Sequence, residues 1–309
     1  MSDSPAAIET ERLGRDYGQT RALDALDLRV PAGSMVGLLG PNGAGKTTTM
    51  LLLATLLAPT RGTARLFGHD VRRNRSAVRR RLGLVFQEAS VDGLLTVEEN
   101  LLFAARLSGL GVRESRVAVA EAMNQSGLTA RSATPARQLS GGWRRLLDIT
   151  RASLHRPDLL ILDEPTVGLD PEHRERLWSM LESQRRSRET TILFSTHYLS
   201  EAEPSDLVVL LSEGRVVASD TPDALRATVG CEVAEIEGPG SEQLVGALRG
   251  LGAAVSVVPT ERGARVGLRG QREAAIELAG SASGIERLSL RPATLEDVYF
   301  ARTQKGSRR

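Results

Sequence analysis

The chain has 309 residues, enough for one large domain or two ordinary ones. Apolar residues make up 41% and charged residues 25%, which is typical of a globular protein, and a net charge of only +2 gives no support to nucleic-acid binding. The single cysteine, Cys231, excludes an internal disulfide. The N-terminus lacks an apolar signal segment, and no apolar run approaches the roughly 20 residues of a membrane span, so we expect a cytoplasmic protein.

Strand-like apolar runs alternate with helix-like segments over residues 8–220, which predicts an α/β core. The expected strands are Ile8–Leu13, Leu26–Val30, Met35–Leu39, Thr63–Leu66, Gly83–Phe86, Leu159–Leu162, Thr191–Ser195, Leu207–Leu211 and Val216–Ala218. The early and late strands, with turns between them, predict antiparallel hairpins beside a parallel sheet. Between residues 89 and 138 the strands stop, and we expect a helical insertion with helices at Thr96–Ser108 and Val112–Ser126.

After about residue 225 the pattern changes, and we expect a second, smaller domain over residues 226–309, following a domain of residues 1–225. Its predicted order is strand, helix, two strands, helix and strand, which is that of a ferredoxin-like sandwich. These elements are expected at Val233–Ile236, Gln243–Leu251, Ala254–Val258, Ala264–Leu268, Arg272–Ala279 and Ile285–Leu290, with a final helix at Leu295–Thr303.

The most specific feature is a glycine-rich segment between an apolar strand and a helix-like run. It consists of Gly40, Pro41, Asn42, Gly43, Ala44, Gly45, Lys46, Thr47 and Thr48. This is the pattern G-x-x-x-x-G-K-T in the strand–loop–helix context that it requires. Its glycines let successive N–H groups turn inward around an anion, Lys46 adds a mobile positive charge, and the Thr47 hydroxyl can bind Mg²⁺. The sequence therefore predicts that the chain binds a nucleoside triphosphate.

Two carboxylates follow the aliphatic run Leu159–Leu162, which is typical of a parallel strand covered on both faces. At the carboxyl end of such a strand, Asp163 can reach a Mg²⁺ ion held at the phosphate-binding loop. Glu164 then lies where it can activate an attacking water molecule as a general base. A strand that merely ends in two solvated acids is the alternative, which the neighbouring phosphate motif disfavours.

A second anion-binding pattern occurs at Ser140, Gly141 and Gly142, which open a predicted helix over Trp143–Leu154. A serine followed by two glycines at a helix N-terminus offers a hydroxyl group and free N–H groups in one direction. Taken alone, the same residues are more typical of an ordinary helix cap with a flexible turn.

Together these motifs resemble those of the ATP-binding cassette (ABC) ATPases over about residues 8–225. GPNGAGKTT is similar to the Walker A motif of that family, LLILDEPT to Walker B, and LSGG to the signature sequence. Further matches are Tyr17 at the adenine-stacking position, Gln87 at the Q-loop, Asp170 at the D-loop and His197 at the switch histidine. The resemblance implies a parallel sheet with an antiparallel β subdomain and a helical insertion, followed here by the small α+β domain.

The resemblance also implies a role for each matched residue. In the family pattern the Gly40–Thr48 loop holds the phosphates, with Lys46 on the β- and γ-phosphate oxygens and Thr47 on Mg²⁺. Gln87 would sense Mg²⁺ and the attacking water and couple the site to a membrane partner. Asp163 would support Mg²⁺.

The remaining roles concern catalysis and assembly. Glu164 would be the general base, and His197 would contact the γ-phosphate. Ser140, Gly141 and Gly142 would bind the γ-phosphate of the nucleotide held by a second copy of the chain, and Asp170 would bridge the two sites.

The chain departs from the family pattern in one place: Trp143 stands where the family often has glutamine after LSGG. The run SGGWRRLLDITRASLHRPDLLILDEPTVGLD resembles exporter ATPases of the daunorubicin-resistance type. We therefore expect an ATP- and Mg²⁺-dependent ATPase on the inner face of the cell membrane, paired with a separate permease that exports a drug-like or lipophilic compound. A cassette protein that acts on ribosomes or DNA and a regulator without a permease are the alternatives.

Overall fold

The computed structural model describes residues 6–88 and 90–303, and within these ranges no helix is both long and apolar enough to cross a bilayer. The chain divides into two compact units. The first unit comprises residues 1–197 and 211–216, and the second comprises residues 198–210 and 217–309. The domain boundary expected near residue 225 stays a prediction.

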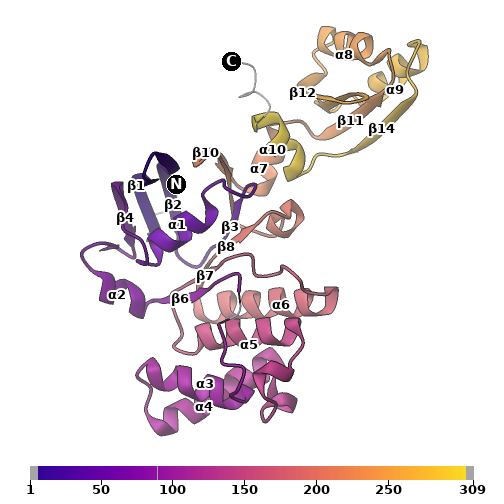
Figure 1. Cartoon of the computed structure of the whole chain (residues 1–309). Coiled ribbons are helices and arrows are strands. Elements are labelled where there is room, and N and C mark those ends of the chain that lie inside the picture. Colours follow the sequence, from indigo (N-terminus) through magenta and orange to yellow (C-terminus); the bar gives the residue numbers. More distant parts are fainter. Residues whose placement is uncertain (1–5, 89, 304–309) are drawn as a thin grey trace. The chain divides into compact units, whose positions relative to one another are not determined.

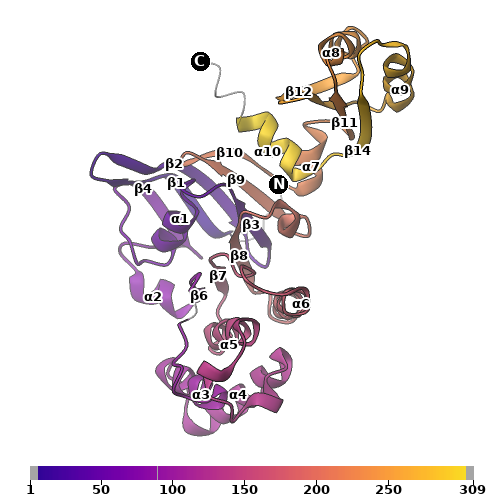
Figure 2. The ribbon, with the colours of Figure 1, turned by 45° about the vertical axis from the view of Figure 1, so that its right-hand side comes forward.

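Six strands form one sheet with the order β10-β9-β3-β8-β7-β6, in which β3, β8, β7 and β6 lie wholly in the first unit (Figures 1 and 2). Within it, neighbouring strands pair in parallel from β3 (Met35–Leu39) through β8 (Thr191–Thr196) and β7 (Leu159–Leu162) to β6 (Leu82–Val85). Every residue of β3, β7 and β8 is buried, as expected for strands covered on both faces. The carboxyl ends of the parallel strands therefore meet at one edge, where sheets of this kind bind ligands.

A four-stranded antiparallel sheet, with the order β2-β1-β4-β5, lies beside this core. Its bounds are Ala6–Tyr17 for β1, Thr20–Pro31 for β2, Arg61–Leu66 for β4 and His69–Asp70 for β5. The first two strands are twelve residues each, longer than their apolar runs predict. Register shifts along their pairing, with positive φ at Arg12 and Ala25, let the ribbon continue through polar residues as a bulged hairpin.

Among the described residues of the first unit, six α-helices are present. They are α1 (Lys46–Leu53), α2 (Arg75–Arg80), α3 (Val97–Leu107), α4 (Val112–Ser126), α5 (Gly141–Ser153) and α6 (Pro171–Arg188). Figures 1 and 2 both show α3 and α4 side by side, with α5 between them and the parallel strands. Buried apolar residues of α3, α4 and α5 form a core of their own, which includes Leu101, Val119 and Leu147. The helical insertion that the sequence predicts therefore has its own hydrophobic centre.

Two strands, β9 (Leu207–Ser212) and β10 (Arg215–Asp220), run through both units, because residues 211–216 return to the first one. The second unit continues with α7 (Pro222–Ala227) and a sheet of order β12-β13-β11-β14. Its elements are β11 (Glu232–Glu237), α8 (Ser241–Gly250), β12 (Ala254–Thr260), β13 (Gly263–Leu268), α9 (Arg272–Ser281), β14 (Arg287–Pro292) and α10 (Leu295–Thr303). This succession and strand order are those of the ferredoxin-like sandwich that the sequence predicts.

Candidate functional site

The segment between β3 and α1 is shaped by close backbone contacts that only glycine tolerates. A Cβ atom at Gly40 would lie 2.4 Å from the carbonyl oxygen of Leu211. At Gly45, where φ is 102°, it would lie 2.8 Å from the carbonyl oxygen of Ala22. The first N–H groups of α1, which starts at Lys46, have no acceptor within the helix and are available to an anion. The residues predicted to hold phosphate therefore form a loop over a helix N-terminus.

Lys46 places a positive charge inside this loop. The residue is only 6% exposed, and its Nζ donates to the carbonyl oxygens of Gly40 at 2.7 Å and Pro41 at 3.1 Å. Burial lowers the pKa of Lys46, while the carboxylates of Glu164 and Asp163 oppose this shift. An ammonium group that is desolvated, and whose hydrogen bonds go to neutral carbonyl oxygens, gains strongly from an incoming phosphate.

The two carboxylates at the end of β7 have different partners. Asp163 accepts a hydrogen bond from the Thr47 hydroxyl at 2.9 Å and another from the Ser195 hydroxyl at 2.5 Å. The backbone N–H of Glu164 donates to the same Ser195 oxygen at 2.9 Å. Thr47 and Asp163 are thus adjacent hard oxygen donors, which fit Mg²⁺ when ligand phosphate and water complete its coordination.

Glu164 is the centre of the site. Its Oε1 lies 3.3 Å from His197 Nδ1 and 3.9 Å from Lys46 Nζ, and its Oε2 accepts from Gln87 Nε2 at 3.5 Å. Its backbone has a φ of 43°, a left-handed conformation that is unfavourable for a residue with a side chain. Such local strain is maintained where the surrounding structure holds it, commonly at functional sites. The structure therefore brings four predicted catalytic residues together.

Ser140 and the two glycines that follow lie apart from this cluster. Ser140 caps α5, accepting a hydrogen bond from the Trp143 backbone N–H at 3.5 Å. Gly141 is exposed and has nothing within 4 Å of an added Cβ. Across the described residues, no hydrogen bond or ion pair joins Ser140 to the phosphate-binding loop. Within one chain the two predicted anion-binding features are therefore separate.

Trp143 and Asp170 meet through His173. Asp170 caps α6 by accepting a hydrogen bond from the His173 backbone N–H at 3.0 Å. Its carboxylate also lies 2.7 Å from Nδ1 of the His173 ring. The His173 ring contacts Trp143 edge-on at 5.0 Å, and the guanidinium of Arg131 lies 3.8 Å above the indole ring. An added Cβ at Gly142 would lie 2.4 Å from the His173 ring. The unusual tryptophan therefore packs against its own chain and joins the α5 and α6 N-termini.

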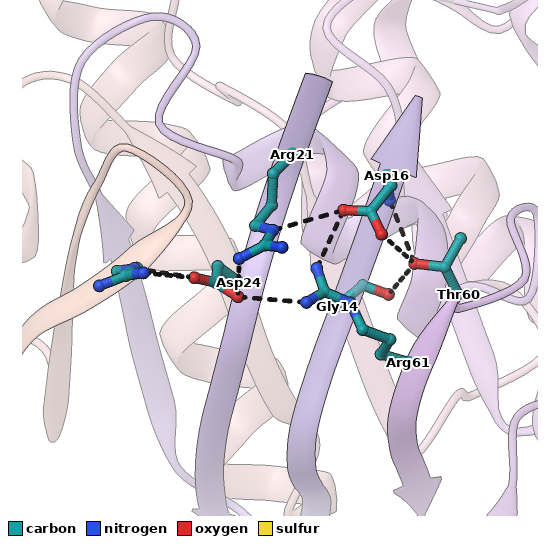
Figure 3. A network of polar contacts seen from close by, with 7 residues as sticks. Gly14, Asp16, Arg21, Asp24, Thr60 and Arg61 are labelled. Carbon is teal, nitrogen blue, oxygen red and sulfur yellow. Dashed lines mark hydrogen bonds and ion pairs between the residues drawn. The ribbon is translucent and has the colours of Figure 1, made fainter. Parts of the chain in front are cut away.

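Tyr17 ends β1, 44% exposed, with the Arg15 guanidinium 4.8 Å from its ring centroid. A charged network fixes the strand ends beside it (Figure 3). Asp24 accepts from Arg215 at 2.6 Å, and Arg61 lies between Asp24 and Asp16, at 3.5 Å and 2.9 Å. An exposed ring on a braced hairpin is a suitable stacking surface for a nucleotide base.

Ser195 is a functional residue that the sequence interpretation missed. Its hydroxyl group is hydrogen-bonded to the Asp163 carboxylate and to the Glu164 backbone N–H. The sequence motifs at the end of this strand indicate only His197. A signal was present: Ser195 is a polar residue near the carboxyl end of β8, a strand that is buried throughout. Buried hydroxyl groups are hydrogen-bonded, so a partner was to be expected.

Comparisons with known proteins agree with this geometry. A family model described as ABC transporter matches residues 23–167. The daunorubicin/doxorubicin resistance ATP-binding protein DrrA of Streptomyces peucetius is 41% identical over 313 residues, covering 98% of this chain and 94% of that protein. The Nod factor export ATP-binding protein I of Paraburkholderia xenovorans (strain LB400) is 41% identical over 236 residues, covering 76% of this chain and 77% of that protein.

A solved dimeric structure of a bacterial ABC transporter cassette is also similar in fold. It matches with a TM-score of 0.64 and 25% sequence identity, covering 69% of this chain and 98% of that one. The likeness lies over a shorter part of this chain than the match to DrrA, which extends over nearly all of it.

The parallel sheet, the glycine loop and the carboxylates at the strand ends define a nucleoside triphosphatase of the P-loop class. The comparisons narrow this class: the chain belongs to the ABC transporter family and is an ATP-binding, ATP-hydrolysing subunit. The predicted family, fold class and resemblance to daunorubicin-resistance ATPases are confirmed.

Proposed function

We propose that two copies of this chain hydrolyse Mg²⁺-bound ATP at shared sites and so drive a separate membrane permease that exports a drug-like or lipophilic compound. The observation that carries the proposal is the clustering of Gln87, His197 and Lys46 around Glu164, next to the phosphate-binding loop. The chain would then act at the cytoplasmic face of the cell membrane, through its permease.

Each residue of the cluster has a part in the proposed reaction. Thr47 and Asp163 would hold Mg²⁺, whose charge offsets that of the phosphates when the ion is bound. Lys46 would leave the carbonyl groups of its loop for the β- and γ-phosphate oxygens. Glu164 would accept a proton from the attacking water, while Gln87 orients that water. His197 would donate a hydrogen bond to the γ-phosphate and so stabilise its developing charge.

A second copy would complete each site. Ser140, Gly141 and Gly142 stand at the N-terminus of α5, and no hydrogen bond or ion pair among the described residues joins Ser140 to the phosphate loop of its own chain. A two-fold arrangement would place them against the nucleotide of the partner copy. The dimeric state of the similar cassette structure supports this assembly.

The helical insertion supplies a surface for the permease. Phe103 and Leu107 of α3 are 59% and 74% exposed, and Leu94, which precedes that helix, is 76% exposed. Phe103 and Leu107 are four positions apart, so they lie on the same side of the helix. Exposed apolar side chains that gather on one element are typical of protein–protein contact sites. The names of the similar proteins, which refer to drug resistance and to export, support an exporter.

Co-purification tests the permease assignment. The tagged chain is recovered from detergent-solubilised membranes of cells that express it, and the membrane protein recovered with it is quantified. Phe103→Asp is expected to lower this recovery at least about tenfold, because a charge replaces an apolar anchor. Phe103→Leu, which keeps the surface apolar, is the matched control and should retain recovery. Equal recovery with both variants, or no membrane protein with the wild type, would contradict the proposal.

A further inference from the structure

Arg145 of α5 is almost completely buried, with 5% of the residue exposed. Of the residues that the structure describes, none brings a carboxylate within 4.0 Å of its guanidinium group. A buried charge without a close counter-ion is costly, because the group leaves water without an equivalent partner. Burial lowers the pKa of Arg145, while the more distant Asp148 and Asp163 oppose this shift. Its retention inside the protein therefore calls for a specific role.

One side of the guanidinium group binds the chain at the end of β7. Nη2 donates to the carbonyl oxygen of Asp163 at 2.8 Å and to that of Glu164 at 3.2 Å. Nε donates to the carbonyl oxygen of Pro165 at 3.0 Å. Three successive carbonyl groups thus converge on one rigid, planar cation, and hydrogen bonds from charged donors are stronger than those between neutral groups.

The other side of the same group binds the segment that carries Gln87. Nη1 donates to the carbonyl oxygen of Phe86 and, at 3.3 Å, to that of Gln87. Gln87 and Glu164 are 77 positions apart in the chain, and their side chains meet at 3.5 Å. The Arg145 guanidinium group bonds the backbone carbonyl oxygens of both residues at once. It therefore fixes the separation of the two backbones, and with it the distance between the Gln87 and Glu164 side chains.

The conformation of Glu164 makes this support more specific. Its left-handed backbone, with a φ of 43°, is held on the amide side by Ser195 and on the carbonyl side by Arg145. Without the second contact the peptide group can rotate toward a more favourable conformation, and the carboxylate would move with it.

A second contact from α5 acts on the same loop. Asp148 accepts from the Ser90 backbone N–H at 3.4 Å and from its hydroxyl at 3.3 Å, and Arg151 donates to the Ser90 carbonyl oxygen at 2.5 Å. The helix α5 therefore contacts this segment at two points, through Arg145 at Gln87 and through Asp148 and Arg151 at Ser90. Of these three side chains, Arg145 is the one that also bonds Glu164.

We propose that Arg145 is a positioning residue that holds the Gln87 and Glu164 side chains in the relative position that ATP hydrolysis needs. Because Arg145 belongs to α5, it also connects both residues to the helix that Ser140 caps. The proposal rests on the roles given to these residues under Proposed function. Because Ser140 would serve the nucleotide of the partner copy, the same side chain links that contact to the catalytic cluster of its own chain.

Replacement of Arg145 tests the proposal in the purified full chain. In Arg145→Gln and Arg145→Lys we expect kcat for ATP hydrolysis to fall at least about tenfold, with KM for ATP within about threefold of wild type. Arg144→Gln is the matched control, because it removes the same charge one position earlier. Among the described residues, the Arg144 side chain bonds only the carbonyl oxygens of Arg137 and Leu139, at 3.4 Å and 3.2 Å, and its variant should keep wild-type kcat.

A double-mutant cycle separates positioning from a general structural effect. If Arg145 acts through Gln87, then Gln87→Ala should cost much less in the Arg145→Lys background than in wild type, a departure from additivity of at least about fivefold. Hydrogen exchange at residues 86–88 and 163–166 should accelerate in both Arg145 variants and remain unchanged in Arg144→Gln.

Two results would overturn the proposal: a kcat in the Arg145 variants equal to that of Arg144→Gln, or additive losses in the cycle. If Arg145→Gln does not fold, the lysine variant, which keeps the charge but not the fork, gives the same comparison. Failure of the proposed function is recognised separately, because the wild type would then lack ATPase activity or Gln87→Ala and Glu164→Gln would leave it unchanged.

Discussion

The carboxylate of Glu164 lies between an amide, an imidazole and an ammonium group, and its two oxygens have different neighbours. Oε1 lies toward His197 and Lys46, and Oε2 lies toward Gln87. Such an arrangement gives one oxygen a fixed set of donors while the other can accept a proton from water. A role as proton acceptor explains why Glu164 is kept at the end of a buried strand in a strained backbone conformation.

Glu164→Gln is expected to bind ATP within about twofold of wild type while kcat falls by about 10²–10⁴-fold, because an amide cannot accept the proton. The measurement is steady-state ATPase activity together with binding of a fluorescent ATP analogue. Because ATP then persists in the shared site, size-exclusion chromatography with ATP should show a stable dimer.

Glu175→Gln is the control for this substitution, since Glu175 is exposed on α6 and should leave kcat unchanged. A Glu164→Gln enzyme with kcat within about threefold of wild type would assign the proton acceptor elsewhere.

At the scale of single residues, the sequence predicted those whose side chains are needed to bind or hydrolyse a phosphate group. Lys46, Asp163, Glu164 and His197 stand in recognisable spacing, and the structure brings them together. Arg145 could not be predicted, because its partners are backbone carbonyl groups from two distant segments, which no side-chain pattern records.

At the scale of elements, the sequence predicted several bounds to the residue. The bounds of β3, β7, α4 and α10 are those predicted. The short helices α2 and α7 and the two-residue strand β5 were not predicted, because so few residues carry no periodic pattern. The helix α5 begins at Gly141, two residues before its predicted start, since the Ser140 cap admits both glycines to the first turn.

The last turns of α6 carry a charge cluster with a testable pH dependence. Arg185 Nε lies 2.8 Å and Arg186 Nε 2.6 Å from the Glu182 carboxylate, and the hydrogen bond from Arg185, followed by that from Arg186, lowers the pKa of Glu182 to about 2. Because this pKa is lower in the folded state, the stabilisation is complete above the ordinary value of 4.5 and is lost as pH falls from there to about 2.

Glu182→Gln should therefore lower the free energy of unfolding of the first unit by about 1 kcal/mol at pH 7, a value kept small because the cluster is solvated. The difference from wild type should shrink below pH 4.5. Urea unfolding followed by tryptophan fluorescence measures it, since Trp143 and Trp178 both lie in the first unit. Glu175→Gln on the same helix controls for loss of a negative charge, and a difference independent of pH would exclude this ion-pair account.

At the scale of the whole molecule, the sequence motifs predict an ATP site with two halves, and one chain does not bring these halves together. Ser140 and the phosphate loop are both predicted to bind anions, but no hydrogen bond or ion pair joins Ser140 to that loop among the residues that the structure describes. Under the proposed function, a complete site takes two copies, each giving one half. The family resemblance predicted this assembly, whereas composition and periodicity alone carry no sign of it.

Mixing two inactive variants tests the shared site. Ser140→Arg and Lys46→Ala should each abolish turnover, but a one-to-one mixture should recover at most about a quarter of wild-type activity, because half of the dimers are mixed and each has one intact site. Lys46→Ala mixed with Glu164→Gln is the control: both lesions lie on the same half of the site, so no activity should return. The same absence of recovery in the first mixture would place Ser140 at its own chain's nucleotide.

The return of residues 211–216 to the first unit has a consequence for how the protein is made. The Leu211 carbonyl oxygen limits the space at Gly40, the Gly214 N–H donates to the Ala44 carbonyl oxygen at 3.1 Å, and Arg215 bonds Asp24 across 191 positions of sequence. Contacts of such long separation form late, after large loops have closed. These contacts cannot form before Arg215 has left the ribosome. We therefore expect the nascent chain to acquire its full ATP affinity only when the second unit is already being translated.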